Sequence, residues 1–168
     1  MLKHYQRLYR YTDYGSAKAS PGFKLFDRVA SYLRGPVADL GCGRNLFVER
    51  CREAGIPASG FDWVAHGADH VGDITGDMDL SEFETATSFD VLEHLRRPGI
   101  EALLQNVGRV PRCILTVHTG PSRRWLGREL HITQMPWPEW RELLSLHIEI
   151  VKADRLTGRR WLCFGEAH

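Results

Sequence analysis

The sequence lacks the long apolar run that a membrane-spanning helix requires. A span needs about 20 consecutive apolar residues, and the longest candidate is the short stretch Cys113-Ile-Leu-Thr-Val117. The first ten residues also contain no apolar segment of the kind found in signal peptides. We therefore expect no membrane partner and a cytoplasmic protein.

Cysteine is scarce and is not arranged as a metal-binding motif. The four cysteines, Cys42, Cys51, Cys113 and Cys163, form no C-x-x-C pair, so a structural zinc site has no support. A chain of 168 residues can bury a hydrophobic core of its own without disulfide bonds. We expect reduced thiols, most of them buried, and the favoured interpretation assigns no metal ligand.

The charges are segregated along the chain although the net charge is only +1. Residues 1–36 carry a balance of +5, residues 37–95 a balance of −9, and residues 96–168 a balance of +5. The acidic middle argues against a uniformly basic nucleic-acid-binding protein. The basic flanks remain compatible with a basic rim around an acidic site.

Helical and strand patterns alternate through most of the sequence. Residues 1–15 show no clean period, but Ser20 can cap a helix that starts at Pro21. The patterns predict helices over residues 21–33, 46–54, 98–109 and from 138 onward, and strands over residues 37–40, 57–62, 69–74, 85–90, 112–118, 147–151 and 160–164. The order predicts an α/β fold: a doubly wound, mostly parallel seven-stranded sheet with helices on both faces and an antiparallel C-terminal edge hairpin. One domain over residues 21–168 would follow an N-terminal arm or lid, residues 1–20.

The first predicted strand leads into a glycine-containing loop and then a helix. In Asp39-Leu-Gly41-Cys-Gly43, the two glycines allow a ligand to approach the backbone at a helix N-terminus. Asp62 ends the second predicted strand, where a carboxylate can accept hydrogen bonds from both ribose hydroxyls of a nucleoside. The spacing therefore predicts a nucleoside-containing cofactor at the carboxyl ends of the strands.

The loop favours S-adenosylmethionine (SAM) over a nicotinamide dinucleotide. A dinucleotide site requires G-x-G-x-x-G to seat a pyrophosphate, and Leu46 occupies the third glycine position. Asp39 also suits a cationic amino group better than a pyrophosphate. A nicotinamide-dependent oxidoreductase is thus the disfavoured alternative.

Four segments resemble the motifs of class I SAM-dependent methyltransferases, in the order and spacing of that family. They are Ala38-Asp-Leu-Gly-Cys-Gly43, Ser59-Gly-Phe-Asp62, Val71-Gly-Asp-Ile74 and Ser88-Phe-Asp-Val-Leu-Glu-His-Leu95. The resemblance covers residues 22–165 and implies a Rossmann-like fold with SAM as cofactor. The cofactor-binding residues it implies are Asp39, Gly41, Cys42, Gly43, Asn45, Asp62, Trp63, Asp73, Ile74 and Phe89.

Within that set, the resemblance implies specific roles. Asp39 would approach the methionine amino group, and Asp62 would hold the ribose hydroxyls. Trp63 would flank the adenine, and Asp73 would accept from its amino group. Asn45 departs from the family, which usually has a third glycine there, although Asn tolerates unusual backbone angles better than most residues.

The acceptor is less clearly specified than the cofactor. The segment Asp90-Val-Leu-Glu93 lacks the D/N-P-P-Y/F motif of enzymes that methylate nucleic-acid amino groups, and instead resembles enzymes that act on small molecules. We therefore favour an oxygen or nitrogen of a small molecule, with His94, His118 and His131 as candidate general bases.

Two alternatives to this function remain. Asp90, Glu93, His94 and His131 resemble the metal-binding set of enzymes that methylate the 2′-oxygen at small-RNA 3′ ends, which would make RNA the partner. The other alternative is a non-catalytic SAM-binding protein.

No substrate domain is inserted in the sequence, so acceptor recognition is expected from the N-terminal arm and the long loop 119–136. Trp137, between two prolines, and Trp125 are candidates for an aromatic lid, whereas Trp140 is expected in the core. Tyr5, Tyr9, Tyr11 and Tyr14 of the arm are candidates to close over the same opening.

Overall fold

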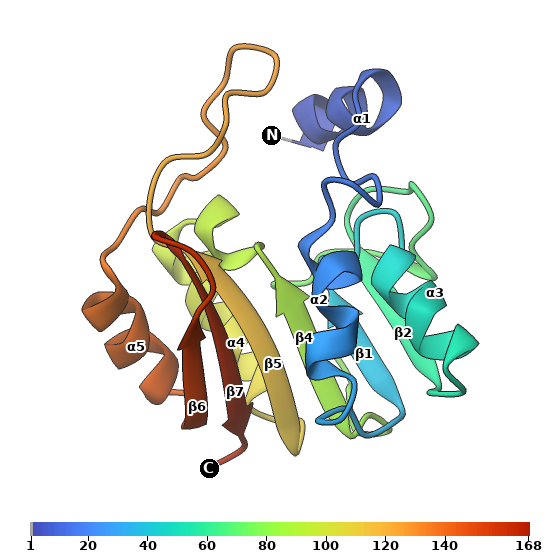
Figure 1. Ribbon diagram of the computed structural model, residues 1–168, viewed down its shortest axis with the longest axis vertical. Coiled ribbons are helices and arrows are strands. Elements are labelled where there is room, and N and C mark those ends of the chain that lie inside the picture. Colours follow the sequence, from blue (N-terminus) through green and yellow to red (C-terminus); the bar gives the residue numbers. More distant parts are fainter. Residues whose placement is uncertain (1) are drawn as a thin grey trace.

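The computed structural model describes residues 2–168 (Figure 1). The helices are α1 (Leu2–Tyr11), α2 (Pro21–Val29), α3 (Leu46–Glu53), η1 (Leu92–His94), α4 (Arg97–Val107) and α5 (Trp137–Ser145). The strands are β1 (Val37–Leu40), β2 (Ala58–Asp62), β3 (His70–Val71), β4 (Thr85–Phe89), β5 (Arg112–His118), β6 (Glu149–Arg155) and β7 (Arg160–Glu166). Within the described residues, no helix is long and apolar enough to span a membrane.

The seven strands form one sheet in the order β3-β2-β1-β4-β5-β7-β6. The first five strands in this order pair in parallel, and β7 pairs antiparallel with both β5 and β6. The predicted fold class is therefore confirmed, including the C-terminal hairpin. Parallel pairing brings the carboxyl ends of β1, β2, β4 and β5 to one edge of the sheet, where α1 and loop 119–136 also lie (Figure 1).

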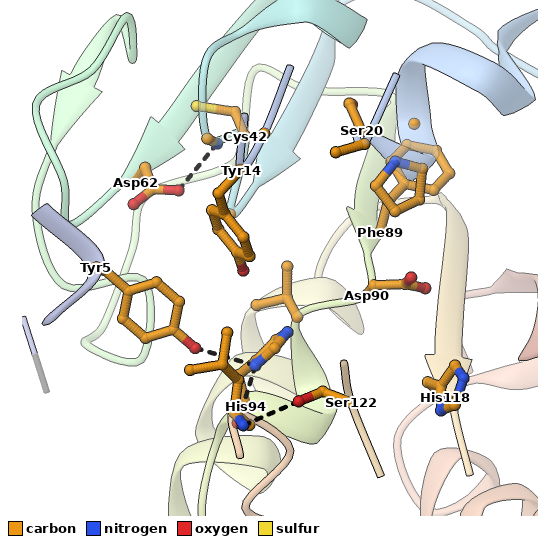
Figure 2. A pocket seen from close by; sticks show the side chains of 18 of the residues that line it. Tyr5, Tyr14, Ser20, Cys42, Asp62, Phe89, Asp90, His94, His118 and Ser122 are labelled. Carbon is orange, nitrogen blue, oxygen red and sulfur yellow. Dashed lines mark hydrogen bonds between the residues drawn. The ribbon is translucent and has the colours of Figure 1, made fainter. Parts of the chain in front are cut away.

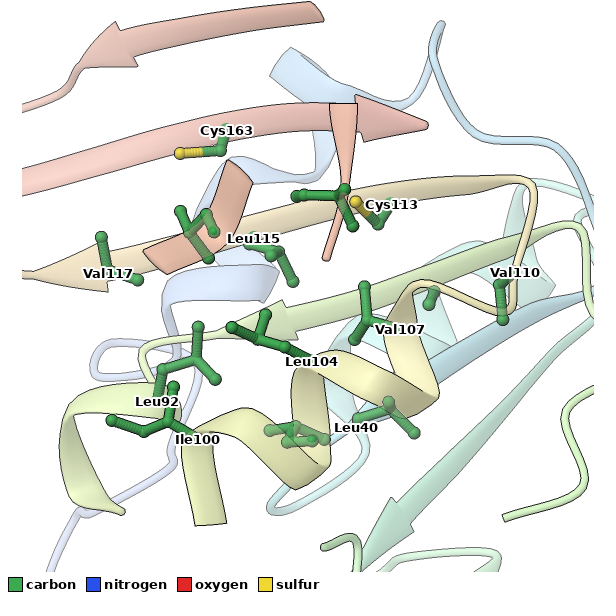
Figure 3. Close-up of a cluster of buried hydrophobic side chains, with 14 of the residues drawn as sticks. Leu40, Leu92, Ile100, Leu104, Val107, Val110, Cys113, Leu115, Val117 and Cys163 are labelled. Atoms are coloured by element: carbon green, nitrogen blue, oxygen red, sulfur yellow. The ribbon is translucent and has the colours of Figure 1, made fainter. Parts of the chain in front are cut away.

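Helices cover both faces of the sheet. On one face, α4 buries Leu104 and Val107 against strand residues such as Leu40 and Leu115 (Figure 3). Trp140 of α5 belongs to the same buried cluster. On the other face, α2 and α3 bury a second apolar cluster that includes Phe26, Val29, Phe47 and Val48. Trp140 is fully buried, as the sequence predicted. Cys51, Cys113 and Cys163 are buried and Cys42 is half-buried, so most of the thiols lie in the interior as expected.

The N-terminal arm is helical where the sequence showed no clean period. Among residues 3–11 of α1, Tyr5 and Leu8 are the two with buried apolar side chains, and most of the others are exposed. Two buried positions three residues apart are too few to establish a helical period. The helix is held by contacts with distant parts of the chain, which local pattern does not reveal.

Two further segments differ from the prediction. The third strand is only His70–Val71, with both side chains exposed, rather than residues 69–74. The predicted helix 21–33 ends at Val29, although Ser20 caps its N-terminus by accepting from the Phe23 N–H at 3.3 Å. Loop 119–136 is irregular, as expected, apart from an isolated bridge between Trp125 and Arg128.

Candidate active site

A cavity of about 290 Å³ opens at the carboxyl ends of the parallel strands. The turns after β1, β2 and β4 form its base, while α1 and loop 119–136 contribute the residues that cover it. Ligands of doubly wound sheets bind at this edge. Eight of the ten cofactor residues implied by the resemblance line the cavity: Asp39, Gly41, Cys42, Gly43, Asp62, Trp63, Ile74 and Phe89.

The glycine loop takes a backbone path that requires small residues. Gly41 has φ +87°, and a Cβ there would lie 2.4 Å from Val91 Cγ2. Gly43 has φ +57°, and a Cβ there would lie 2.6 Å from the Tyr9 hydroxyl. The backbone therefore forms the cavity wall at a place where side chains would block it.

Asn45 adopts the left-handed conformation, with φ 63°, a backbone region that Asn tolerates better than most residues. Its side chain is buried and donates from Nδ2 to Asp69 Oδ2 at 3.1 Å. Asn45 thus preserves the turn into α3 but does not line the cavity.

Asp62 connects two parts of the cavity wall. Its Oδ2 accepts the Gly43 N–H at 2.9 Å and its Oδ1 accepts the Val64 N–H at 2.9 Å, so the carboxylate fixes the glycine loop against the end of β2 (Figure 2). Burial raises its pKa, while the backbone N–H donors act in the opposite direction. Each oxygen retains acceptor capacity toward the cavity.

Asp39 is a buried carboxylate without a cationic partner among the described residues. Its Oδ1 accepts from Thr87 Oγ1 at 2.7 Å, and its side chain lies beside the cavity. Burial raises its pKa to about 7, partly offset by the Thr87 hydrogen bond. Such a group gains most from a cationic ligand, because the ligand would compensate the lost hydration of the charge.

Asp73 is not brought to the cavity. Its Oδ1 accepts from the Thr75 N–H at 2.9 Å and from Thr75 Oγ1 at 2.7 Å, forming an exposed local turn. Ile74 lines the cavity directly beside it. The structure therefore brings Ile74, but not the Asp73 carboxylate, to the cavity where the resemblance places the adenine.

The three candidate histidines gather in one cluster on the cavity wall. His131 lies between the other two, with ring centroids 5.0 Å from His94 and 4.9 Å from His118. The His131 Nδ1 lies 2.6 Å from the Gly120 carbonyl, and the His94 Nδ1 lies 3.0 Å from the Leu130 carbonyl. Because a carbonyl only accepts, each Nδ1 carries the proton in these contacts and each Nε2 is left with a lone pair.

Burial and the neighbouring His131 lower the pKa of His94 to about 4. This imidazole is therefore neutral at physiological pH. Its Nδ1 is also 3.0 Å from the Tyr5 hydroxyl of α1 (Figure 2). The N-terminal arm therefore directly contacts a candidate catalytic residue.

Glu93 is a site residue that the favoured interpretation of the sequence omitted. It is fully buried, its Oε1 accepts the His118 N–H at 3.1 Å, and its Oε2 has no hydrogen-bond partner among the described residues. Burial, followed by the nearby Asp90, raises its pKa. One ligand atom from each of Glu93, His94 and His131 lies within 4.8 Å of the others.

The N-terminal arm is fastened to the glycine loop. Arg44, within that loop, donates from Nε to the Tyr14 carbonyl at 3.0 Å and from a terminal nitrogen to the Tyr9 carbonyl. Tyr5, Tyr9 and Tyr14 all line the cavity, whereas Tyr11 is 66 % exposed. No local sequence signal identified Arg44, because its role depends on contacts with residues about 30 positions away.

The two tryptophans proposed as a lid differ in position. Trp125 lines the cavity and packs edge-on against Tyr14, with ring centroids 5.2 Å apart. Trp137 instead stacks on Trp161 at 4.3 Å, away from the cavity-lining residues. The prediction of Trp137 as a lid is therefore wrong, because a β7 aromatic partner pairs with it at the start of α5.

Comparison with known proteins places this architecture among methyltransferases. A scan of protein-family models finds none that matches, and a search of curated proteins finds no matching relative. The PH0226 protein of Pyrococcus horikoshii OT3 is similar over 95 % of this chain and 98 % of its own, with TM-score 0.76 and 13 % identity.

Two solved methyltransferases show the same likeness. The 1,6-didemethyltoxoflavin-N1-methyltransferase of Burkholderia thailandensis, with bound 1,6-didemethyltoxoflavin and S-adenosylhomocysteine (SAH), has TM-score 0.66 and 19 % identity over 92 % of this chain and 80 % of its own. The magnesium protoporphyrin IX methyltransferase of Synechocystis PCC 6803, with bound SAM, has TM-score 0.62 and 18 % identity over 86 % of this chain and 79 % of its own. The chain therefore has the fold of class I SAM-dependent methyltransferases.

Proposed function

We propose that this protein is a SAM-dependent methyltransferase that transfers a methyl group to an oxygen or nitrogen of a small molecule. The observation that carries the proposal is the meeting of Asp39, Asp62 and the glycine loop in one cavity of a methyltransferase fold. Asp39 supports it most directly, since a buried carboxylate with a pKa of about 7 fits a cationic amino group.

The chain's residues have complementary parts in this proposal. Asp39 holds the amino group, Asp62 accepts from the ribose hydroxyls, and Trp63 and Ile74 flank the adenine. SAM, when bound, supplies a methyl group already activated on a sulfonium, so the protein mainly aligns donor and acceptor. Residues 2–20 of the arm cover the cavity, which would keep water from the methyl group during transfer.

The cluster of His94, His118 and His131 would remove a proton from the acceptor. His131 is the preferred base, because its Nδ1 is held by the Gly120 carbonyl while its Nε2 is left to accept a proton. His94 supports this site as a neutral neighbour, and His118 lies on the other side of His131. An acceptor such as a neutral amine, which is nucleophilic without losing a proton first, needs only alignment.

Calorimetry with SAM, SAH and NADH, followed by transfer assays with labelled methyl groups, tests the proposal. We expect saturable binding of SAM and SAH, no binding of NADH, and transfer of label to an acceptor in a small-molecule extract. Binding without transfer to any extract would favour the non-catalytic alternative. Failure of all three ligands to bind would contradict the proposal.

A second candidate is metal-assisted transfer to a ribose hydroxyl of RNA, favoured by the arrangement of Glu93, His94 and His131. The Nδ1 atoms of both imidazoles face backbone carbonyls, and the neighbouring Glu93 Oε2 has no partner in the part of the chain that the structure describes. This combination matches the donor pattern of metal sites. Asp90 does not join them, because its carboxylate accepts from Thr116 and pairs with Arg160. A bound divalent ion would lower the pKa of a hydroxyl acceptor.

Titration with Co²⁺, which has visible absorption when bound, distinguishes the two candidates. Metal assistance predicts stoichiometric Co²⁺ binding that is lost in His131→Ala but kept in the control His147→Ala, together with at least about 100-fold lower activity after chelation. Full activity in the presence of a chelator would support proton removal by histidine alone.

A further inference from the structure

The two segments that cover the cavity are basic. Residues 2–20 and 119–136 together contain seven Lys or Arg residues and two acidic residues, Asp13 and Glu129. The basic residues are Lys3, Arg7, Arg10, Lys18, Arg123, Arg124 and Arg128. The basic segments at the two ends of the sequence therefore supply the residues around the opening of the cavity, whereas the acidic central segment supplies its base.

These basic side chains form no ion pairs within the described part of the chain. Every salt bridge found there joins residues outside the two covering segments. The carboxylate of Glu129 is occupied by its own loop, where it accepts the N–H groups of Ser122 at 2.8 Å and His131 at 2.9 Å. The positive charge at the opening is therefore not neutralised by neighbouring side chains.

Contacts between the arm and the loop bring their charges together. Tyr5 and Leu8 of α1 share a buried cluster with Leu130 of the loop. The pKa of His4 is lowered by burial and then by Arg128 and Arg7, which shows that cations of both segments act on one place. Arg7 of the arm and Arg128 of the loop are thus close enough to act on the same side chain.

Arg123 connects this surface with the interior of the cavity. It lines the cavity, and its guanidinium carbon lies 4.8 Å from the centroid of Trp125, which also lines it. Stacking on an aromatic ring orients a guanidinium while leaving its N–H donors free. Arg160 also lines the cavity, but it is paired with Asp90.

The base of the cavity is acidic instead, because the carboxyl groups of Asp39 and Asp62 line it and both residues are buried. An acidic base suits a cationic methyl donor, whereas the basic opening suits a ligand of the opposite sign. On the basis of the proposed function, we infer that the methyl acceptor is a small molecule with a phosphate or carboxylate group, which Arg123 and Arg128 bind at the cavity opening. A cavity of about 290 Å³ that is covered by the arm and by loop 119–136 favours a small anion over a nucleic-acid strand.

A pair of matched double variants tests this inference. Arg123→Gln/Arg128→Gln removes two charges at the opening. Arg96→Gln/Arg141→Gln removes two exposed arginines that lie outside the cavity lining and form no ion pair in the described residues. Both variants change the net charge equally, so a difference between them reports position rather than total charge.

The first measurement is thermal unfolding of SAH-saturated protein in phosphate, acetate or chloride of equal ionic strength. A ligand that binds only the native state raises the unfolding temperature. We expect phosphate or acetate to stabilise the wild type and the control, and expect at least about tenfold weaker binding in Arg123→Gln/Arg128→Gln. Phosphate alone indicates a phosphorylated acceptor, and acetate alone indicates a carboxylate.

The second measurement follows labelled methyl groups into a small-molecule extract separated by anion exchange. Label in the retained fraction, with an increased KM in Arg123→Gln/Arg128→Gln and unchanged SAH affinity, supports the inference. Three results would overturn it. They are label only in the unretained fraction, an equal loss of anion binding in both double variants, and preferential binding of a single-stranded oligonucleotide. Absence of SAH binding by the wild type would instead contradict the proposed function, which keeps the two failures distinct.

Discussion

Asp62→Ala is expected to weaken SAH binding by at least about 100-fold. Hydrogen bonds from hydroxyls to a charged acceptor contribute about 1.5–3 kcal/mol each, and Asp62 is proposed to accept two from the ribose. The substitution also removes the acceptors of the Gly43 and Val64 N–H groups, so the glycine loop loses its connection to β2. Both effects act in the same direction, and calorimetry measures their sum.

Asp73→Ala is the informative comparison for Asp62→Ala. The family resemblance assigns Asp73 to the adenine, but its carboxylate is bonded to Thr75 and lies outside the cavity lining. We therefore expect less than about a threefold loss of SAH affinity, from an indirect effect on the neighbouring Ile74. Equal losses in the two variants would show that Asp73 turns toward the ligand.

Thermal unfolding of both variants separates lost binding from lost folding. Asp62→Asn adds a second control, because it keeps the side-chain volume while placing an amide beside the Gly43 N–H. Retention of SAH affinity in Asp62→Ala with a normal unfolding temperature would exclude the proposed ribose contact.

The sequence predicted the sheet and the base of the site well, because both depend on local pattern. Strand β5 contains the largely apolar run Cys113–Val117, and the loop after β1 is defined by two glycines that take positive φ. Asp39 and Asp62 follow from their positions at strand ends. These features require no knowledge of which distant residues meet.

The covering part of the site depends on contacts that local pattern cannot encode. Tyr5 meets His94 across 89 positions of sequence, and His131 reaches the same cluster from loop 119–136. The prediction for Trp137 was wrong because its partner, Trp161, lies on a different element. Glu93 was weighed only in the RNA alternative, and its complete burial became evident only from the fold.

SAH affinity is expected to depend on pH through Asp39. Its pKa of about 7 in the free protein means that roughly a tenth of the molecules carry the ionised form at about pH 6. A bound ammonium favours the carboxylate, so binding below about pH 7 must release a proton. Affinity should therefore fall about tenfold from about pH 8 to about pH 6, as calorimetry in buffers of equal ionic strength will measure.

Asp39→Asn provides the control for this pH dependence. The same substitution should also raise the stability of the free protein while it lowers the affinity for SAH. The amide keeps an acceptor for Thr87 but carries no charge, so SAH should bind much more weakly and with little dependence on pH. Because burial raises the pKa of Asp39 above its unfolded value of 3.8, this residue reduces the stability of the free protein as pH rises from about 4 to about 7. At about pH 8 the variant should consequently be more stable than the wild type, by on the order of 4 kcal/mol in free energy of unfolding, and should unfold at a higher temperature. Increased stability together with lost affinity would identify Asp39 as a group retained for its ligand, whereas lower stability would show that its charge is already compensated within the fold.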